Sequence, residues 1–196
     1  MGRRSLKETR QKEILMSFYQ VAKKEGIENA SIAKVANRLD VNPSLIMHYF
    51  KSRDEMLIAF VSFILEKYMA IYKTNGEINS KEKLLDLIDG LFSRKWNRLF
   101  NDSVFYSCYA LIYRNKNFKK QFKTLHDSLR KSLVQSFVES NQHGVTAISD
   151  IDKTVEIVFN IIEGAYYYLG MVDDKDEYET KTEWYKNHVL GMLHLE

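Results

Sequence analysis

The chain contains little that interrupts a helix. Its 196 residues include one proline and eight glycines. An all-β domain of this length needs many turns, which are rich in these two residues, so their scarcity argues against such a domain. Hydrophobic residues make up 45% and charged residues 28%, as in globular rather than disordered proteins. The composition predicts a folded, all-α protein with one ordinary domain or two small ones.

Cysteine and long apolar segments are also scarce. Cys108 is the single cysteine, which excludes an internal disulfide and a multi-thiolate metal site. The longest mainly apolar stretch, Met56–Leu65, has ten residues, about half of the roughly 20 that a membrane-spanning helix requires. The basic N-terminus is followed by no apolar run of the kind found in signal peptides. These absences predict a cytoplasmic protein without a membrane partner, a bound metal or a cofactor.

The net charge is only +3, but it is unevenly distributed. The first 55 residues carry eleven lysines and arginines against seven acidic residues, whereas the remaining 141 carry eighteen against nineteen. A basic first quarter on a neutral body favours a polyanion as partner, although solvated basic faces are common as well.

Apolar positions at helical spacing predict about nine helices. Gly26 and Gly76 are expected to end the first and the fourth helix, and Asn79, with Glu82 three residues later, to begin the fifth. We interpret the acidic segment 173–177 as a solvated turn, because it lacks the spaced ligands and central glycine of a calcium loop. The expected helices span residues 5–25, 31–39, 42–50, 52–75, 79–100, 102–115, 117–142, 150–172 and 180–194.

The segment Ser31–Phe50 has the pattern of a helix-turn-helix, with two short helices and a tight turn at Asp40. Ser31 is a suitable cap for the first helix, and Asn42 for the second. Pro43 suits the first position of the second helix, where its missing N–H group is harmless. The segment therefore predicts a DNA-binding unit.

The second helix of such a motif enters the major groove of DNA. Its periodicity predicts that Ile46 and Phe50 point inward. The residues expected to face DNA are Asn42, Pro43, Ser44, Leu45, His48 and Tyr49.

The first 60 or so residues resemble the DNA-binding region of the TetR family of bacterial transcriptional regulators, through the run SIAKVANRLDVNPSLIMHYFKSRDEML. Two positions depart from the family pattern. Asp40 stands where glycine is usual, and Asp tolerates left-handed backbone geometry, so we expect the turn to form. Met47 stands where family members often place a phosphate-contacting tyrosine. The matching positions are Ser31, Val35, Ala36, His48, Tyr49, Phe50, Lys51 and Arg53.

Residue chemistry suggests how these side chains would meet DNA. Ser44 and Leu45 suit base edges, and basic or hydroxyl-bearing side chains suit phosphates. A flexible N-terminal arm carrying Arg3 and Arg4 is expected either to enter the minor groove or to be a disordered tail. The expected phosphate contacts are Lys34, His48, Tyr49, Lys51 and Arg53.

The resemblance implies a DNA-binding domain over residues 1–51 and a ligand-binding and dimerisation domain over residues 52–196. It implies a homodimer through the last two helices, a palindromic operator and repression that a small molecule relieves. The residues support the dimer independently, because the segment Ile151–Val172 is apolar nearly all round and must be buried on both sides.

The middle and last helices carry candidate effector contacts. Tyr106, Tyr109 and Tyr113 are predicted to share one helical face, a pattern found in cores as well as in pockets. Glu163 lies among apolar residues and is expected either to meet a cationic effector or to pair with a basic residue across the dimer seam. The C-terminal part loosely resembles the choline-responsive BetI branch, so a cationic or aromatic effector is expected. The candidate residues are Trp96, Tyr106, Tyr109, Tyr113, Glu163 and Tyr167.

Other classes of protein fit less well. No glutamate is followed three residues later by histidine, and the sequence has no phosphate-cradling glycine motif, zincin pair or nucleophile elbow, so we do not expect an enzyme. The alternative is a helical small-molecule-binding or membrane-surface protein without specific DNA binding. It would explain the basic N-terminus but not the pattern between Ser31 and Phe50.

Overall fold

The computed structural model describes residues 3–71, 76–93 and 101–195, and all regular secondary structure in these ranges is helical. This confirms the predicted all-α class. The elements are α1 (Arg3–Glu25), α2 (Ile32–Leu39), α3 (Pro43–Tyr49), α4 (Arg53–Ile71), α5 (Lys81–Leu91), α6 (Asp102–Ala110), the short 3-10 turn η2 (Leu111–Tyr113), α7 (Lys116–Gln142), α8 (Ile151–Leu169) and α9 (Lys175–Met192).

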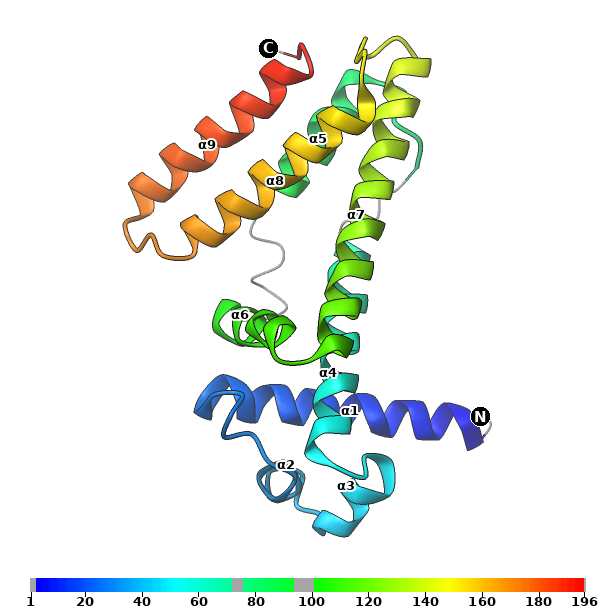
Figure 1. Cartoon of the computed structure of the whole chain (residues 1–196), viewed down its shortest axis with the longest axis vertical. Coiled ribbons are helices and arrows are strands. Elements are labelled where there is room, and N and C mark those ends of the chain that lie inside the picture. Colours follow the sequence, from blue (N-terminus) through cyan, green and yellow to red (C-terminus); the bar gives the residue numbers. More distant parts are fainter. Residues whose placement is uncertain (1–2, 72–75, 94–100, 196) are drawn as a thin grey trace. The chain divides into compact units, whose positions relative to one another are not determined.

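The helices form two compact units. Unit 1 comprises residues 1–68 and 97–125. In it, α1 packs against α2 on one side and α6 on the other, and α2 packs against α3 (Figure 1). Its core includes the fully buried Ile14, Phe18 and Phe60, with the rings of Phe18 and Phe60 in edge contact at 5.0 Å. The apolar positions at helical spacing along α1 therefore become the support for the two short helices.

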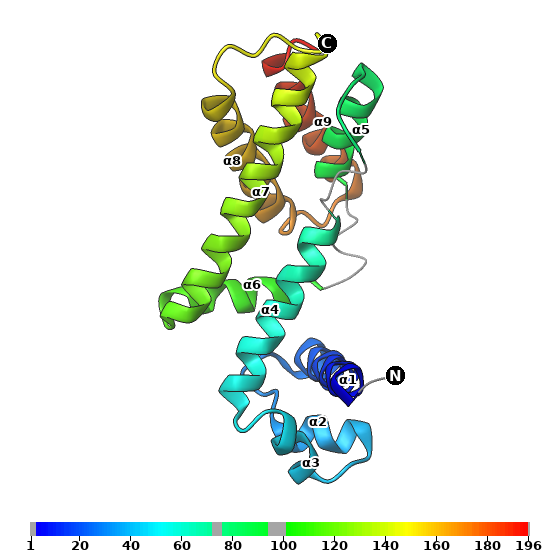
Figure 2. The same ribbon diagram turned by 90° about the vertical axis from the view of Figure 1, so that its right-hand side faces the viewer.

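Unit 2 comprises residues 69–96 and 126–196. Its helices α8 and α9 lie side by side, and α5 contacts α9 (Figure 2). An ion pair of 2.8 Å joins the Lys186 ammonium on α9 to the Asp89 carboxylate on α5. The hydroxyl of Tyr166 on α8 donates to the backbone carbonyl of Leu91 at 2.8 Å. Apolar packing in this unit is thus supplemented by polar links to α5.

Several predicted boundaries are confirmed. Gly26 follows α1 with a φ of +85°, a conformation that glycine adopts without strain. Asp40 ends α2 in the left-handed region, at φ 52° and ψ 49°, so the turn forms without glycine. Asn42 caps α3 through its side-chain oxygen, which accepts from the Ser44 amide at 2.9 Å, and Pro43 occupies the first turn.

Other boundaries differ from the prediction. Ser80, not Asn79, caps α5, because its hydroxyl accepts from the Lys83 amide. The helix ends at Leu91 rather than near residue 100, and residues 94–100 lie outside the described ranges. The segment 173–177 is not a turn throughout, since Asp174 caps α9 and the next residues form its first turn. Acidic side chains at that position favourably oppose the helix dipole, which explains the earlier start.

The predicted domain boundary between residues 51 and 52 lies just before α4 begins. This division by expected function stays a prediction. The compact units do not follow this boundary, because α6 and the first part of α7 belong to the same unit as α1–α3.

Candidate functional site

The positions of α2 and α3 are fixed by caps and by buried apolar residues. The Ser31 hydroxyl accepts from the Lys34 amide at 3.3 Å and so caps α2 as predicted. Val35 and Ala36 in the same helix are fully buried. The Val41 amide donates to the Ala36 carbonyl at 3.0 Å, which closes the turn before α3.

The outer face of α3 is available for contact. Pro43, Ser44 and His48 are exposed, whereas Leu45 and Tyr49 are half-buried. The rings of His48 and Tyr49 meet edge to face at 5.1 Å. The other face packs inward as predicted, through Ile46 and Phe50, which are buried in the core. Short polar and ring-bearing side chains therefore form one surface of this helix.

Two lysines flank this surface. The Lys51 side chain is exposed, and within the described part of the chain no hydrogen bond or ion pair engages its ammonium group. Lys34 is already paired, because its ammonium lies 2.6 Å from the Glu25 carboxylate. The same hydrogen bond lowers the pKa of Glu25. Lys51 is thus the more accessible cation for a phosphate.

Arg53 makes contacts within its own unit, and its predicted phosphate contact stays a prediction. Its Nε donates to the Ala30 carbonyl at 2.8 Å, and its Nη2 donates to the carbonyl of Ile27. Both carbonyls belong to the loop between α1 and α2. Arg53 therefore ties the first turn of α4 to that loop. Local sequence reasoning missed this role, because the partners lie 23 and 26 residues earlier.

The N-terminal arginines do not form the predicted flexible arm. The helix α1 begins at Arg3, so the backbones of Arg3 and Arg4 are helical. Their side chains lie outside the described part of the structure. Their contact with the minor groove stays a prediction.

The predicted effector residues are divided between the units. Tyr106, Tyr109 and Tyr113 belong to unit 1, Glu163 and Tyr167 to unit 2, and Trp96 lies outside the described residues. The three tyrosines do not share one helical face as predicted, because α6 ends at Ala110 and Tyr113 lies in η2.

The tyrosines of unit 1 have different surroundings. The Tyr109 ring meets Phe122 edge to face at 5.2 Å. Tyr113 is 86% exposed. Tyr106 and Tyr113 line one depression of about 660 Å³ that is open to solvent, and Glu28 and Arg114 line it with them. Sequence analysis did not select these two charged residues, because no local motif contains them.

Glu163 on α8 faces basic groups on α7. Its Oε2 lies 3.8 Å from Nε2 of His126. Burial raises the pKa of Glu163 to about 7, although the nearby Arg130 guanidinium partly opposes this. Arg130 itself lies over the Phe159 ring at 4.0 Å and donates to the Glu156 carboxylate at 2.8 Å. Glu163 therefore has neighbours within its own chain, whereas Tyr167 is 60% exposed.

Neither a metal-binding cluster nor a membrane-spanning helix is found among the described residues. They contain no group of three or more histidine, cysteine, aspartate or glutamate side chains that could hold a metal ion. None of the helices within the same ranges is long and apolar enough to cross a membrane.

Comparisons with known families agree with this geometry. The family described as bacterial regulatory proteins, tetR family, matches residues 19–60, which include α2 and α3. The family described as Tetracyclin repressor-like, C-terminal domain, matches residues 79–195, more than half of the chain. The chain belongs to the TetR family. It is therefore a helix-turn-helix transcriptional regulator, which decides against the alternative without specific DNA binding.

Curated TetR-type relatives are distant in sequence. The regulator PksA of Bacillus subtilis is 24% identical over 162 residues, covering 80% of this chain and 77% of that protein. The regulator BetI of Stenotrophomonas maltophilia is 22% identical over 95 residues, covering 47% of this chain and 48% of that protein. The matched part thus spans about half the length of BetI.

Solved structures share the fold over nearly the whole chain. A TetR transcription regulator from Haloarcula marismortui superposes with a TM-score of 0.79 at 18% identity, covering 95% of this chain and 97% of that one. A transcriptional regulator from Saccharomonospora viridis, solved in complex with choline, gives a TM-score of 0.72 at 16% identity, covering 95% and 96%. These likenesses support the TetR fold of both units.

Proposed function

We propose that this TetR-family protein is a homodimeric repressor that binds a palindromic operator and leaves it when a small-molecule effector binds. The observation that carries the proposal is the outer face of α3, where Ser44 and His48 are exposed over a buried Ile46. This protein acts by binding rather than by catalysis, and it acts in the cytoplasm.

In this proposal, α3 lies in the major groove. Ser44 and Leu45 contact base edges, with Leu45 suited to a thymine methyl group. Asn42 caps the N-terminal end of α3. Pro43 and Ser44, in the first turn of this helix, then lie at the end that approaches DNA. Phosphate contacts set affinity and register. Their donors are His48, Tyr49, Lys51, the helical Arg3 and Arg4, and Lys34 once it leaves Glu25.

The proposed dimer forms through α8 and α9. Both helices expose large apolar side chains, which a second subunit would cover. Gly164 lies on the same face of α8, and a Cβ atom added there would meet nothing within 4 Å, so another backbone can approach closely. A two-fold dimer would place two α3 helices about 34 Å apart, one turn of DNA. The exposed apolar residues are Ile157 and Tyr168 of α8, Trp184 of α9, and Met171, which follows α8.

The effector is proposed to bind in the C-terminal part. Within the described residues the ion pair of Glu163 is with His126 and none is with a lysine or arginine, so the carboxylate suits a cationic group of an effector. The Saccharomonospora viridis neighbour was solved with choline, which supports this class of effector. Tyr167 of the same unit remains a candidate aromatic contact, whereas the roles of Trp96, Tyr106, Tyr109 and Tyr113 stay predictions from the sequence.

Anisotropy of a labelled duplex from the DNA that flanks the gene tests the DNA contact. We expect salt-sensitive binding that prefers this duplex over a scrambled one. Lys51→Gln should weaken binding of both duplexes and lower the salt dependence by about one ion per subunit. Lys131→Gln, an exposed change in α7 of unit 2, is the matched control. No binding of either duplex at low salt would contradict the proposal.

Gly164→Leu tests the dimer. The added side chain has open space within one subunit, so the helix should fold. It would clash with a partner subunit, and light scattering should therefore show a monomer at concentrations where the unaltered chain is a dimer. Gly164→Ala, a smaller change at the same position, is the control. A Gly164→Leu dimer of unchanged affinity would place the interface elsewhere.

A further inference from the structure

The depression in unit 1 joins two segments that are far apart in sequence. Glu28, from the loop between α1 and α2, forms one part of its lining. Tyr106 and Ser107 of α6, Tyr113 of η2 and Arg114 form another part. Its volume of about 660 Å³ lies within the usual range for small-molecule sites. A ligand here would touch both segments.

The depression carries opposite charges. Within the described part of the chain, no hydrogen bond or ion pair engages the Glu28 carboxylate or the Arg114 guanidinium. Glu28 lines the depression together with residues of α6, and its charge adds to burial in raising the pKa of the Cys108 thiol on that helix. One acidic and one basic side chain therefore stay available in the same depression.

Aromatic surface accompanies these charges. Tyr113, which lines the depression, is 86% exposed, so its ring is accessible to a ligand. A tyrosine ring can hold an ammonium group over its face or stack on another ring. Tyr106 and Ser107 are half-buried deeper in the same lining.

We propose that this depression binds a small zwitterion such as a free amino acid, with its ammonium group against Glu28 and Tyr113 and its carboxylate on Arg114. Arg114 suits this role because a guanidinium can hold a carboxylate through two parallel hydrogen bonds. The site is separate from Glu163 and Tyr167, which belong to unit 2.

Occupancy would act on the DNA-binding helices through the loop before α2. Arg53 holds the backbone of this loop at Ile27 and Ala30, and Ser31 at its end caps α2. A zwitterion that bridges Glu28 and Arg114 would fasten this loop to the end of α6. We expect a change in duplex affinity, and only this consequence rests on the proposed function.

Isothermal titration calorimetry of the full chain without DNA tests the site itself. The probes are L-phenylalanine, phenethylamine, which keeps only the ammonium, and 3-phenylpropionate, which keeps only the carboxylate. We expect L-phenylalanine to bind at least tenfold more tightly than either analogue, a difference of about 1.4 kcal/mol. L-leucine should bind as well, since both charges are kept.

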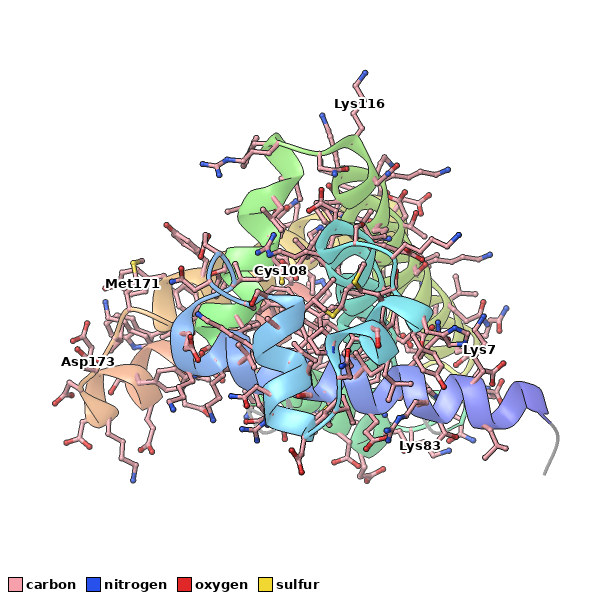
Figure 3. All side chains as sticks on the ribbon, turned by 90° about the horizontal axis from the view of Figure 1, so that it is seen from below. Lys7, Lys83, Cys108, Lys116, Met171 and Asp173 are labelled. Carbon is pink, nitrogen blue, oxygen red and sulfur yellow. The ribbon has the colours of Figure 1, made fainter. Side chains whose placement is uncertain are left out.

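Variants assign the binding to the two charged residues. Glu28→Gln and Arg114→Gln should each weaken L-phenylalanine binding about tenfold. Lys116→Gln and Glu66→Gln are matched controls and should leave binding unchanged. Lys116 lies two residues after Arg114, and Figure 3 shows its side chain extending outward from the beginning of α7. Glu66 is exposed on α4 of the same unit.

The outcomes separate this proposal from the regulator function. Unaltered binding in Arg114→Gln, equal binding of phenethylamine, or no measurable binding of either amino acid at millimolar concentration would overturn the zwitterion site. Duplex anisotropy with the same variants is read separately. If neither the unaltered chain nor any variant binds the duplex, while calorimetry shows the expected preference for amino acids, the zwitterion site stands and the proposed function fails.

Discussion

Replacement of Arg53 separates a structural role from a DNA contact. Arg53 donates to the carbonyls of Ala30 and Ile27, and its third contact, to the Glu28 carbonyl, is longer at 3.4 Å. Arg53→Gln would leave two carbonyls of the loop without their charged donor. We therefore expect the loop and α2 to become less stable, independently of DNA.

The magnitude follows from these two bonds. A hydrogen bond to a charged group contributes about 1.5–3 kcal/mol when it is well buried. The Arg53 side chain is 34% exposed, so water can replace part of each bond. We therefore expect Arg53→Gln to lower the unfolding free energy of unit 1 by about 2 kcal/mol. This figure counts two hydrogen bonds, each weakened by access of water. Arg53→Lys should recover only part, because one ammonium cannot reproduce the planar fork.

Hydrogen exchange measures this effect locally. Amides in the segment 27–40 should exchange about 30-fold faster in Arg53→Gln, the factor that corresponds to about 2 kcal/mol. Lys51→Gln, which removes an exposed charge two residues earlier, should leave their exchange unchanged while weakening duplex binding. Unchanged exchange in Arg53→Gln together with weaker duplex binding would refute the structural role and restore the phosphate contact.

Substitutions at three further positions test the site and its support. Ser31→Ala removes the cap of α2 and should cost about 1 kcal/mol of unfolding free energy, measured by urea denaturation. Asp40→Gly should raise the urea midpoint, because glycine adopts the left-handed conformation at φ 52° without strain, and Asp40→Val should lower it. Burial raises the pKa of Glu163 from 4.5 to about 7 in the folded chain. Between these values the folded chain keeps a proton that the unfolded chain loses, so this group makes the protein less stable as the pH rises from about 5 to 7. Glu163→Gln should remove this loss of stability. The urea midpoints of the variant at about pH 5 and about pH 7 should therefore differ less than those of the unaltered chain.

Much of the helix-turn-helix could be predicted because its signals are local. A cap acts on amides two or three residues away, as for Ser31 and Asn42, and helical periodicity alone puts Ile46 and Phe50 on the inner face. The left-handed turn at Asp40 also depends on one residue's own conformational preference.

Other features could not be predicted because they depend on tertiary packing. The contacts of Arg53 with two carbonyls of a distant loop could not be predicted, because they exist only once that loop lies beside α4. Glu28 and Arg114 are 86 positions apart and share a depression only after α6 packs on α1. A longer helix through Tyr113 was predicted because no proline or glycine marks the end of α6 at Ala110.

The link between Arg53 and the loop before α2 has a consequence for sequence divergence. Arg53 contacts backbone carbonyls, which every residue provides, so this link places no restriction on the side chains of the loop. The fold should therefore tolerate almost any residue at the exposed position Glu28, while Arg53 itself should be hard to replace. In a saturation-mutagenesis screen, selection for an acidic residue at position 28 would accordingly report on a ligand rather than on folding.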